Sequence, residues 1–599
     1  MSDRIRQAAS SANAVIDTDG LLAAFNDAGV LHPLDVSAAQ TIARLHGETD
    51  DRVLLAAALA VRGTRFGHVC VRIDDLRDAV VVDWQDPDAV DLLPWPDPVE
   101  WQAAVDSSAL VGNGEGHHPL VEVDDRLYLE RYFRYEQLVA ELLVTRSGVA
   151  AREIDPAVGE AVDRLLDPGS GQRTAARQAL NGRLAVIAGG PGTGKTYTIG
   201  ALLVALAAAG EFPLVAVCAP TGKAAARLGE AITQQAADTG DARVAETLAQ
   251  VRPSTIHRLL GWTWRRGRFE RDATNRLPHD LVIVDEMSMV SLPLAAKLLA
   301  AVRDDATVVM VGDPFQLESI EAGTVLADIV DPATRADSPD SPLRPRVVVL
   351  ERGYRFEEDS TIADFADSVR RGAADPALEL LAAGGDTLHW VPDRSSPGFL
   401  DLWHEVVSSR VRLVDAARSS DLDQSLQALA ELAVLCARRE GPSGVSRWGR
   451  EIEEALDERY PGLRWRGEWY PGRPVMITRN DYNLDLYNGD IGVTVETDEG
   501  NRAAFERGET RTYPLSHLTE HTTVHAMTIH KSQGSQFEQV VVVLPDEESR
   551  LLTRELLYTA VTRARHRVWL VGSEAVVREA ISRSVQRASG LGPLLWGTH

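Results

Sequence analysis

The feature that most constrains this chain is a glycine-rich segment, GGPGTGKT, which lies between two apolar runs. The run LAVIAG before it predicts a buried strand, and YTIGALLVALAAA after it predicts a helix. This is the P-loop pattern in the strand–loop–helix setting that it requires, and it predicts an α/β fold that binds a nucleotide. We expect Lys195 to reach the β and γ phosphates and the Thr196 hydroxyl to hold Mg²⁺. The predicted phosphate cradle comprises Gly189, Gly190, Pro191, Gly192, Thr193, Gly194, Lys195 and Thr196.

Two polar strand ends downstream complete a hydrolytic site. The strand-like run LVIVDE ends in Asp285 and Glu286, and a later run ends in VGDPFQ, which contains Gln316. We expect Asp285 to hold Mg²⁺, Glu286 to polarise the attacking water, and Gln316 to bind both that water and the γ phosphate. Alone, an acidic strand end is a solvated end and GDPxQ is a turn. After a P-loop, they indicate an ATPase.

Two arginines lie in segments suited to act from the opposite side of a cleft. Arg355 is part of LERGYRF and Arg563 is part of YTAVTRAR. Phosphoryl transfer spreads negative charge over the equatorial oxygens, so an arginine delivered across a cleft accelerates it by roughly 10³–10⁵-fold. The alternative is that either residue is an ordinary surface arginine, since arginine is common in this chain.

The charge balance is acidic, which lowers the expectation of nucleic-acid binding without excluding it. The net charge is −26. Residues 1–150 carry 25 acidic and 12 basic residues, so this quarter of the chain holds half of the net negative charge. A local basic channel is sufficient, because phosphate contacts act over a Debye length of roughly 10 Å. The chain has only four lysines among its 62 basic residues. We interpret Lys195, Lys223, Lys297 and Lys531 as positions that need a compact ammonium, the alternative being chance.

Length and cysteine content exclude several classes of protein. At 599 residues, three or four domains are expected. The three cysteines form no CxxC pair, which argues against a disulfide framework and a zinc site. No apolar run approaches the roughly 18 residues of a membrane span, and the amino terminus has no long apolar core. A cytoplasmic protein with no membrane association is expected.

The apolar runs predict two α/β layers. LAVIAG, PLVAVCAP, DLVIVDE and ATVVMVGD form one series, and RVVVL, RPVMIT, QVVVVLP and HRVWLVGS follow later. Short, fully apolar runs suit parallel sheets covered on both faces. The first 150 residues mix helical and strand-like patterns and contain no catalytic motif. Within them, residues 127–143 predict an amphipathic helix whose apolar stripe is core rather than a partner groove.

With these motifs in order, the sequence resembles the superfamily 1 helicases and, more closely, the RecD family. The resemblance rests on GGPGTGKT, APTGKAAARL, STIHRLLG, VDEMSMV, VGDPFQLESI, LERGYRF, TIHKSQGSQF and LLYTAVTRAR, which span about residues 172–565. It implies an ATP-driven 5′–3′ DNA helicase with ATP and Mg²⁺ as cofactors. ATP would bind between two RecA-like lobes, and single-stranded DNA would cross the top of both.

The resemblance also implies a domain division. Residues 1–150 would form a mixed, partner-docking domain, and residues 151–345 would form the first lobe. The second lobe would comprise residues 346–480 and 525–599, interrupted by a small SH3-like β insertion at 481–524. The Asn488-Gly489 turn signal lies in that insertion, for which a surface hairpin without DNA contacts is the alternative.

Further site residues follow from the resemblance. Gln172, upstream of the P-loop, would read adenine. The DNA path would comprise Thr221, Lys223, His257, Thr528, His530, Lys531, Ser532 and Gln533. A structural histidine is the alternative for His257. The family usually has Glu at position 536, where this chain has Gln, so the ribose contact of that side chain is open. Residues 262–271, WTWRRGRFER, could stack bases, but a structural hairpin is the preferred interpretation.

The front end separates branches of the family. Stand-alone members carry a longer front end with helix-hairpin-helix motifs, and none is visible here. The compact acidic front resembles the branch that works within RecBCD, in which this domain docks on RecC and the nuclease belongs to RecB. The expected partners are therefore single-stranded DNA, duplex DNA ends, and RecB-like and RecC-like subunits. Two alternatives are an autonomous helicase and a regulatory subunit that binds ATP with little motor activity.

Overall fold

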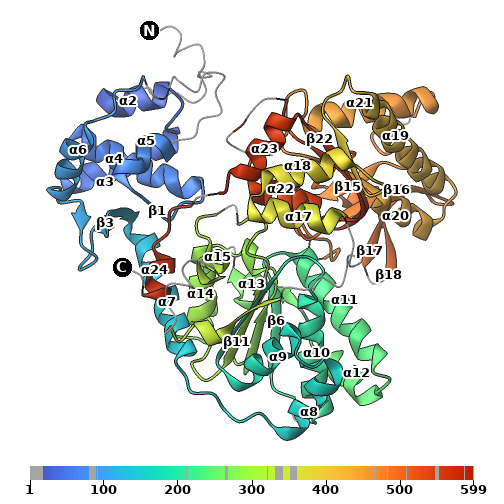
Figure 1. Cartoon of the computed structure of the whole chain (residues 1–599), viewed down its shortest axis with the longest axis horizontal. Helices are drawn as coiled ribbons and strands as arrows, with labels where there is room; N and C mark the ends of the chain where they lie inside the picture. The colour runs from blue at the N-terminus through green and yellow to red at the C-terminus, as the bar shows by residue number, and fades with distance from the viewer. Residues whose placement is uncertain are drawn as a thin grey trace.

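A computed structural model describes the chain at residues 18–79, 90, 92–210, 212–263, 267–319, 321–330, 341–350, 361–463, 467–481, 483–507, 509–546, 549, 552–585 and 587–597. Three bodies surround a central junction (Figure 1): an amino-terminal domain in blue, a first lobe in green and a second lobe in yellow to red. Within the described residues, no helix has the length and apolarity that a membrane crossing needs.

The first lobe is built on a six-stranded parallel sheet of order β12-β5-β11-β10-β6-β7. Its strands are β5 (Leu184–Gly189), β6 (Val215–Ala219), β7 (Ser254–Thr255), β10 (Leu281–Val284), β11 (Thr307–Gly312) and β12 (Val347–Leu350). Alternate strand residues enter two separate cores, so both faces are covered. One face packs on α8 (Pro156–Leu165), α9 (Gly171–Asn181), α10 (Lys195–Ala208), α11 (Gly222–Asp238) and α12 (Ala242–Leu248). The other packs on α7 (Glu130–Ser147), α14 (Leu292–Ala301) and α15 (Val325–Val330).

The second lobe repeats this plan with a five-stranded parallel sheet of order β13-β22-β21-β14-β20. Its strands are β13 (Leu388–Val391), β14 (Leu432–Cys436), β20 (Met527–Thr528), β21 (Phe537–Val543) and β22 (Ala564–Val571). One face is covered by α17 (Thr361–Arg371), α18 (Ala374–Ala383), α22 (Arg554–Val561) and α23 (Glu574–Ser582). The other is covered by α19 (Pro397–Arg418) and α21 (Val445–Arg459). The expected pair of α/β layers is confirmed.

A five-stranded antiparallel sheet of order β18-β17-β16-β15-β19 forms the insertion in the second lobe. The strands are β15 (Pro474–Ile477), β16 (Ile491–Thr497), β17 (Gly500–Arg507), β18 (Glu509–Pro514) and β19 (His521–Thr523). One face of this sheet buries Val493 and Val495 against α19 and α20 (Leu422–Glu431). In the described residues the edge strands β18 and β19 do not pair with each other.

Strand pairing moves two of the expected boundaries. The first lobe does not end at residue 345, because β12 pairs with β5 in parallel from Val347 to Leu350. The insertion does not begin at residue 481, because β15 pairs with β16 and β19 from residue 474 onward. Apolar runs such as RVVVL and RPVMIT show that a strand exists but not which sheet it joins, since that depends on partners distant in sequence.

The amino-terminal domain combines helices with a four-stranded sheet of order β1-β4-β3-β2. The helices are α2 (Gly20–Asp27), α3 (Pro33–His46), α4 (Asp51–Arg65), α5 (Leu76–Ala79) and α6 (Pro98–Asp106). The strands are β1 (Cys70–Val71), β2 (Val111–Gly112), β3 (Leu120–Val123) and β4 (Arg126–Leu129). Helix α7 then leads into the first lobe, where Phe133, Val139 and Leu143 are buried, which confirms that its apolar stripe is core.

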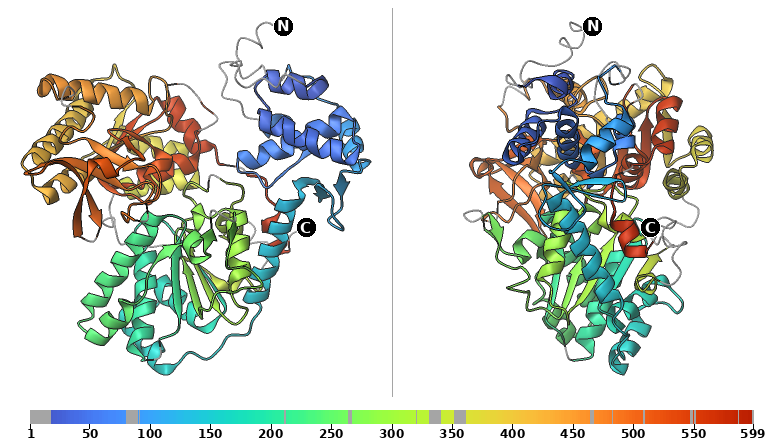
Figure 2. Two further views of the ribbon diagram at one scale, coloured as in Figure 1. Left: turned by 180° about the vertical axis from the view of Figure 1, so that it is seen from behind. Right: turned by 90° about the vertical axis from the view of Figure 1, so that its left-hand side faces the viewer.

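The carboxyl-terminal segment ties the three bodies together. After α23 it leaves the second lobe, crosses beside β1 and ends in α24 (Leu591–Trp596), which packs on α7 (Figures 1 and 2). The amide of Val69 in the amino-terminal domain donates to the carbonyl of Ala588, at 2.9 Å. Trp596 is buried in the core of the first lobe. We call residues 583–597 the carboxyl-terminal strap.

Candidate functional site

The P-loop joins β5 to α10 through a turn that only glycine adopts easily. Gly192 and Gly194 have φ of 79° and 85°. A Cβ at Gly189 would lie 2.6 Å from Thr193 Oγ1, so a side chain there would fill the cradle. Lys195 Nζ donates to the carbonyls of Gly189 and Gly190, at 2.7 and 2.8 Å, which holds the ammonium over the loop. This cradle fits a chain of phosphates.

Gln172 supports the loop from behind. It lies in the first turn of α9, which is capped by the Ser170 hydroxyl. Its side chain is 6% exposed, and Nε2 donates to the Thr193 carbonyl at 3.1 Å. Gln172 therefore lies against the phosphate loop, and its role with adenine stays a prediction.

Asp285 and Glu286 lie at the carboxyl end of β10, opposite the P-loop. Burial, and then the adjacent Glu286, raise the pKa of Asp285 to about 7, while Lys195 opposes this increase. Glu286 is half-buried and has φ of 52°, a left-handed conformation that few residues other than glycine adopt. A buried carboxylate with this environment fits a divalent cation, which would stabilise its ionised form.

Thr196, the other predicted Mg²⁺ ligand, is half-buried in the first turn of α10. Among the described residues no three His, Cys, Asp or Glu side chains form a metal cluster. Thr196 and Asp285 stay the predicted Mg²⁺ ligands.

Gln316 is buried beside Asp313 at the end of β11. Its Nε2 donates to Asp313 Oδ2 at 2.9 Å, and the Tyr558 hydroxyl from the second lobe donates to the same oxygen at 3.2 Å. Burial raises the pKa of Asp313, against the effect of nearby Lys195. Gln316, the predicted sensor of the γ phosphate, is thus held by a carboxylate that also contacts the other lobe.

Arg563 reaches the cleft from the end of α22. It is 4% exposed, and Nε donates to the Thr559 carbonyl at 3.0 Å. Burial lowers its pKa, while Glu286 and Asp313 of the first lobe favour its charged form. Arg563 therefore lies within electrostatic range of the hydrolytic carboxylates. Arg355 lies outside the described residues.

The sequence did not identify two residues that share this cleft. Tyr558 contacts the P-loop, since a Cβ at Gly190 would lie 2.8 Å from its hydroxyl. Arg227 of α11 is exposed to solvent, yet the surrounding protein, and then Arg563 and Arg565, lower its pKa. Tyr558 lies in the motif LLYTAVTRAR and Arg227 in the motif APTGKAAARL. Membership of these motifs was the only feature of the sequence that could have identified them as site residues.

The predicted DNA residues of the first lobe follow its edge strands rather than its central ones. β5, β11 and β10 are central and end at the nucleotide residues, whereas β6 and β7 form one edge of the sheet. Thr221 follows β6 and caps α11 by accepting from the Ala224 amide at 3.2 Å. His257 follows β7. The predicted nucleotide residues and the predicted DNA residues thus follow the carboxyl ends of strands in one parallel sheet.

Lys223 connects the first lobe to the second lobe and the insertion. Its Nζ donates to Ser535 Oγ at 2.6 Å and to the Gly489 carbonyl at 3.2 Å. A Cβ at Gly222 would lie 2.2 Å from the Tyr487 ring, so the insertion packs directly on the start of α11. The Asn488-Gly489 turn therefore has contacts with a predicted DNA residue.

The segment Thr528–Gln533 runs from β20 into a short 3-10 helix (Ile529–Ser532). Ser532 is buried, and its hydroxyl donates to the Ile529 carbonyl, whereas His530 is exposed. Burial, and then Arg439, lower the pKa of Lys531. Gln533 Nε2 donates to the Leu317 carbonyl at 2.8 Å, so this segment contacts the loop that carries the sensor.

His257 is separate from Lys223 and lies among aromatic rings. Its ring centroid is 5.6 Å from that of Phe269 and 6.4 Å from that of Trp262. Trp262 and Phe269 belong to the two strands of the expected hairpin, β8 (Trp262–Thr263) and β9 (Arg268–Phe269). Lys297 Nζ lies 5.4 Å from the Phe269 centroid. These mutual contacts support the structural interpretation of the hairpin.

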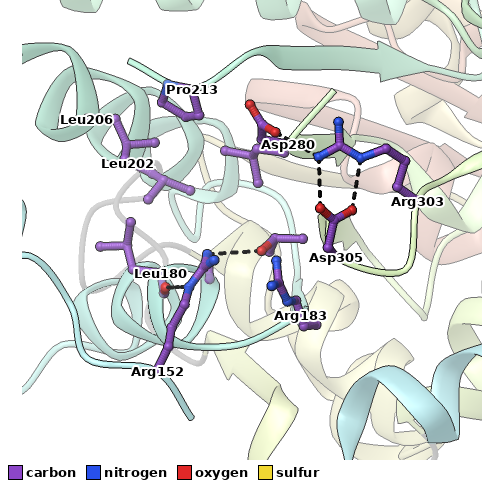
Figure 3. A pocket seen from close by; sticks show the side chains of 12 residues that line it. Arg152, Leu180, Arg183, Leu202, Leu206, Pro213, Asp280, Arg303 and Asp305 are labelled. Atoms are coloured by element: carbon purple, nitrogen blue, oxygen red, sulfur yellow. Dashed lines mark hydrogen bonds and ion pairs between the residues drawn. The ribbon is translucent and has the colours of Figure 1, made fainter. Parts of the chain in front are cut away.

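The first lobe also has a pocket that none of the predicted residues lines. It has a volume of about 320 Å³, and Figure 3 shows side chains that line it, among them Asp280 just before β10 and Asp305 just before β11. The P-loop instead follows the carboxyl end of β5. Arg303 pairs in the pocket with Asp280 and Asp305, both at 2.9 Å, and Arg152 donates to Thr307 Oγ1 at 3.1 Å. The pocket is distinct from the cleft between the lobes.

Comparison with known proteins gives three domain matches. Residues 27–128 match the N-terminal domain of RecBCD enzyme subunit RecD, residues 172–322 match an AAA domain, and residues 523–571 match the UvrD-like helicase C-terminal domain. RecBCD enzyme subunit RecD of Mycolicibacterium smegmatis is 45% identical, over 95% of this chain and 98% of that protein. The chain belongs to the RecD family. It is a superfamily 1 helicase subunit with a nucleotide-binding domain.

More distant relatives are consistent with this assignment. The RecD subunit of Haemophilus influenzae is 33% identical, over 71% of this chain and 72% of that protein. The ATP-dependent RecD2 DNA helicase of Deinococcus radiodurans is 30% identical over 77% of this chain, which covers 57% of that protein. The match to the RecD amino-terminal domain agrees with the interpretation of the compact front end.

Proposed function

We propose that this RecD family member hydrolyses ATP to move 5′–3′ along single-stranded DNA, as the motor subunit of a RecBCD-type complex. One observation carries the proposal. Lys195, Asp285 and Gln316 belong to the first lobe, and the buried Arg563 of the second lobe lies within electrostatic range of Glu286 and Asp313 beside them. Two lobes that share one nucleotide site can convert hydrolysis into a relative movement of their DNA contacts.

Each residue has a proposed role in hydrolysis. Lys195 would bind the β and γ phosphates when its ammonium exchanges the carbonyls of Gly189 and Gly190 for phosphate oxygens. Thr196 and Asp285 would hold Mg²⁺, which offsets the charge of the phosphates when bound.

Glu286 would accept hydrogen bonds from the attacking water, and Gln316 would orient it. Arg563 would stabilise the charge that develops on the transferred phosphoryl group, and Arg355 is proposed for the same role. Gln172 would bind adenine through its side-chain amide.

The DNA path is proposed along the top of both lobes. Lys223 and Lys531 would neutralise phosphates, and the side chains of Thr221, Thr528, His530, Ser532 and Gln533 would position the backbone without reading sequence. The contact of Lys223 with Ser535 and Gly489 supports this, because it brings residues of three parts of the chain to one surface. His257 would extend the path at the edge of the first lobe.

The proposed partners are DNA ends and RecB-like and RecC-like subunits, with the nuclease in the RecB-like subunit. The match of residues 27–128 to the amino-terminal domain of a RecBCD subunit supports this assembly. Residues 1–150 have an excess of acidic residues, which disfavours DNA as the ligand of the amino-terminal domain. We therefore propose that this domain binds a protein partner.

The first experiment measures ATP hydrolysis by the purified chain with and without single-stranded DNA. We expect low turnover alone, strong stimulation by DNA, and no stimulation for Lys195→Ala. If DNA gives no stimulation to folded protein, the assay is repeated with RecB-like and RecC-like subunits. Stimulation only in the complex would mean that partners complete the DNA path.

Continued absence of stimulation would favour a regulatory subunit over a motor. Unwinding of substrates with a 5′ or a 3′ single-stranded tail then tests polarity, since a 5′–3′ motor requires the 5′ tail. Co-purification with the two large subunits separates the complex from an autonomous helicase.

A further inference from the structure

The carboxyl-terminal strap inserts one arginine into the junction of the three bodies. Arg587 Nε lies 3.0 Å from Glu318 Oε2, and one guanidinium NH₂ donates to the Glu321 carbonyl at 3.3 Å. The two side chains of the ion pair are only 14% and 12% exposed. Loss of one partner of such a pair leaves a buried charge uncompensated.

Glu318 belongs to the loop that carries the sensor. It follows Gln316 by two residues, and between them Leu317 is buried in the core of the second lobe, where its amide donates to Thr559 Oγ1 at 2.8 Å. Phe315 contacts the second lobe too, beneath the guanidinium of Arg370 at 5.0 Å. The loop therefore cannot shift at Gln316 without moving either the second lobe or its contact with Arg587.

Arg587 also lies against the amino-terminal domain. A Cβ at Gly67 would lie 2.4 Å from the guanidinium carbon, and Gly67 has φ of +89°, so both space and backbone require glycine. The Gly67 carbonyl accepts from the Gly323 amide at 3.0 Å, beyond Glu321 in the sensor loop. His68 Nδ1 accepts from the Ala588 amide at 3.1 Å.

The proposed DNA segment lies within range of the same guanidinium. His530 is exposed at its tip, yet its pKa is lowered by the surrounding protein and then by the positive charges of Arg587 and Arg439. The contacts of Arg587 itself join the sensor loop to the amino-terminal domain.

We propose that Arg587 is a positioning residue that transmits the nucleotide state sensed at Gln316 to the amino-terminal domain. The inference rests on the proposed function, because it takes Gln316 as the sensor. Arg587 touches no substrate. It acts by holding Glu318 and Gly67 in one unit, so that a displacement of the sensor loop moves both.

The geometry favours an arginine for this role. The planar guanidinium contacts Glu318, the Glu321 carbonyl and the Gly67 backbone from different edges, and a lysine ammonium can keep the ion pair but not the flat contact. Loss of the guanidinium leaves the hydrogen bond from the Gly323 amide to the Gly67 carbonyl as the remaining link between the sensor loop and the amino-terminal domain, and therefore weakens their coupling.

The test follows hydrogen–deuterium exchange of the full chain with and without β,γ-imido-ATP and Mg²⁺. In wild type we expect slower exchange at residues 316–319 and a second change at residues 63–70. Arg587→Met should keep the first change and reduce the second at least threefold, and Arg587→Lys should restore about half of it. Glu318→Gln, which preserves shape, should act in the same direction as Arg587→Met.

The matched control is Arg578→Met, which removes an arginine that pairs at the surface with Asp375 and Glu574. It should respond as wild type. In parallel, Arg587→Met should lower the stimulation of ATP hydrolysis by single-stranded DNA about tenfold, with the KM for ATP within about twofold of wild type. If Arg587 had only a structural role, Arg587→Met would lower the melting temperature and would not lower DNA stimulation selectively while the KM for ATP stays near that of wild type.

The outcomes separate the two proposals. If wild type responds to the nucleotide and Arg587→Met transmits the change equally well to residues 63–70, the role of Arg587 is overturned and the proposed function stands. If wild type does not respond to the nucleotide at all, the proposed function fails and this inference fails with it.

Discussion

At the scale of single residues, Arg563 tests whether two lobes build one active site. Its neighbour in the same motif, Arg565, is half-exposed and pairs with Glu538 at 2.9 Å, away from the cleft. Arg563 is instead buried, with Glu286 and Asp313 as its nearest opposing charges. The two arginines therefore form a matched pair with the same sequence context and different surroundings.

We predict that Arg563→Ala lowers the kcat of DNA-stimulated ATP hydrolysis by roughly 10³-fold or more, because a cleft-spanning arginine acts mainly in the transition state. The KM for ATP should change by less than about threefold. Arg565→Ala should keep near-normal kcat. Steady-state kinetics with saturating single-stranded DNA measure both, and melting curves verify folding. Equal losses in the two variants would contradict the role of Arg563.

Residue identities were predictable where chemistry depends on local sequence. The P-loop glycines need only their own backbone geometry, and Asp285 needs only a strand that ends beside them. Tyr558 could not be found this way, because its contacts with Gly190 and Asp313 cross between lobes that are distant in sequence. Its function depends on which helix faces the cleft, and a motif does not encode that.

At the scale of elements, the strap is held to β1 by a neutral histidine. His68 Nδ1 accepts from the Ala588 amide, which requires that nitrogen to be unprotonated. Burial, and then the positive charges of Arg587 and Arg62, lower the pKa of His68 to about 4. The unfolded value is 6.5, so the native state resists protonation between these two pH values.

We predict that the strap loosens as pH falls from 6.5 towards 4, because the open state binds a proton that the closed state excludes. The neutral His68 stabilises the closed strap fully above pH 6.5, and this stabilisation amounts to roughly 3 kcal/mol at most. Hydrogen exchange of the Val69 amide, corrected for its intrinsic rate, measures this opening. His68→Asn keeps an acceptor but cannot titrate, so it should flatten the dependence.

The control is His566→Asn, since His566 is 77% exposed and pairs at the surface with Glu538. It should leave the pH dependence of the Val69 amide unchanged. An identical pH dependence in wild type and His68→Asn would show that another group controls the strap.

Elements were largely predictable from sequence, but their sheet membership was not. The apolar runs identified β5, β6, β10 and β11 because strands buried on both faces are apolar throughout. The sequences of β12 and β15 are apolar runs of the same kind, yet β12 joins the sheet of the first lobe and β15 joins the sheet of the insertion. The docking of the strap was not predicted, because Trp596, Arg587 and the Ala588 backbone contact residues that are distant in sequence.

At the scale of the whole molecule, the acidic charge and the proposed DNA path are separated. The amino-terminal domain, which carries half of the net charge, and the insertion lie on opposite sides of the molecule (Figure 1). At physiological ionic strength a Debye length of about 8 Å screens the acidic domain from a DNA strand beside Lys223. Binding should therefore depend on a few local cations rather than on the net charge.

Two lysines allow this to be tested and also decide the role of the hairpin. Lys223 bridges the lobes and the insertion, whereas Lys297 lies between the Tyr135 and Phe269 rings, at 5.8 and 5.4 Å from their centroids. We predict that Lys223→Met weakens single-stranded DNA binding severalfold and lowers the slope of log K against log salt by about 0.7, because one phosphate contact is lost.

Lys297→Met should keep the slope of wild type, because its ammonium supports the hairpin rather than DNA. Fluorescence anisotropy with an oligo-dT strand over a range of salt concentrations measures both slopes. An equal loss of slope in Lys297→Met would instead extend the DNA path over His257 and the hairpin, and would favour base stacking by Trp262 and Phe269.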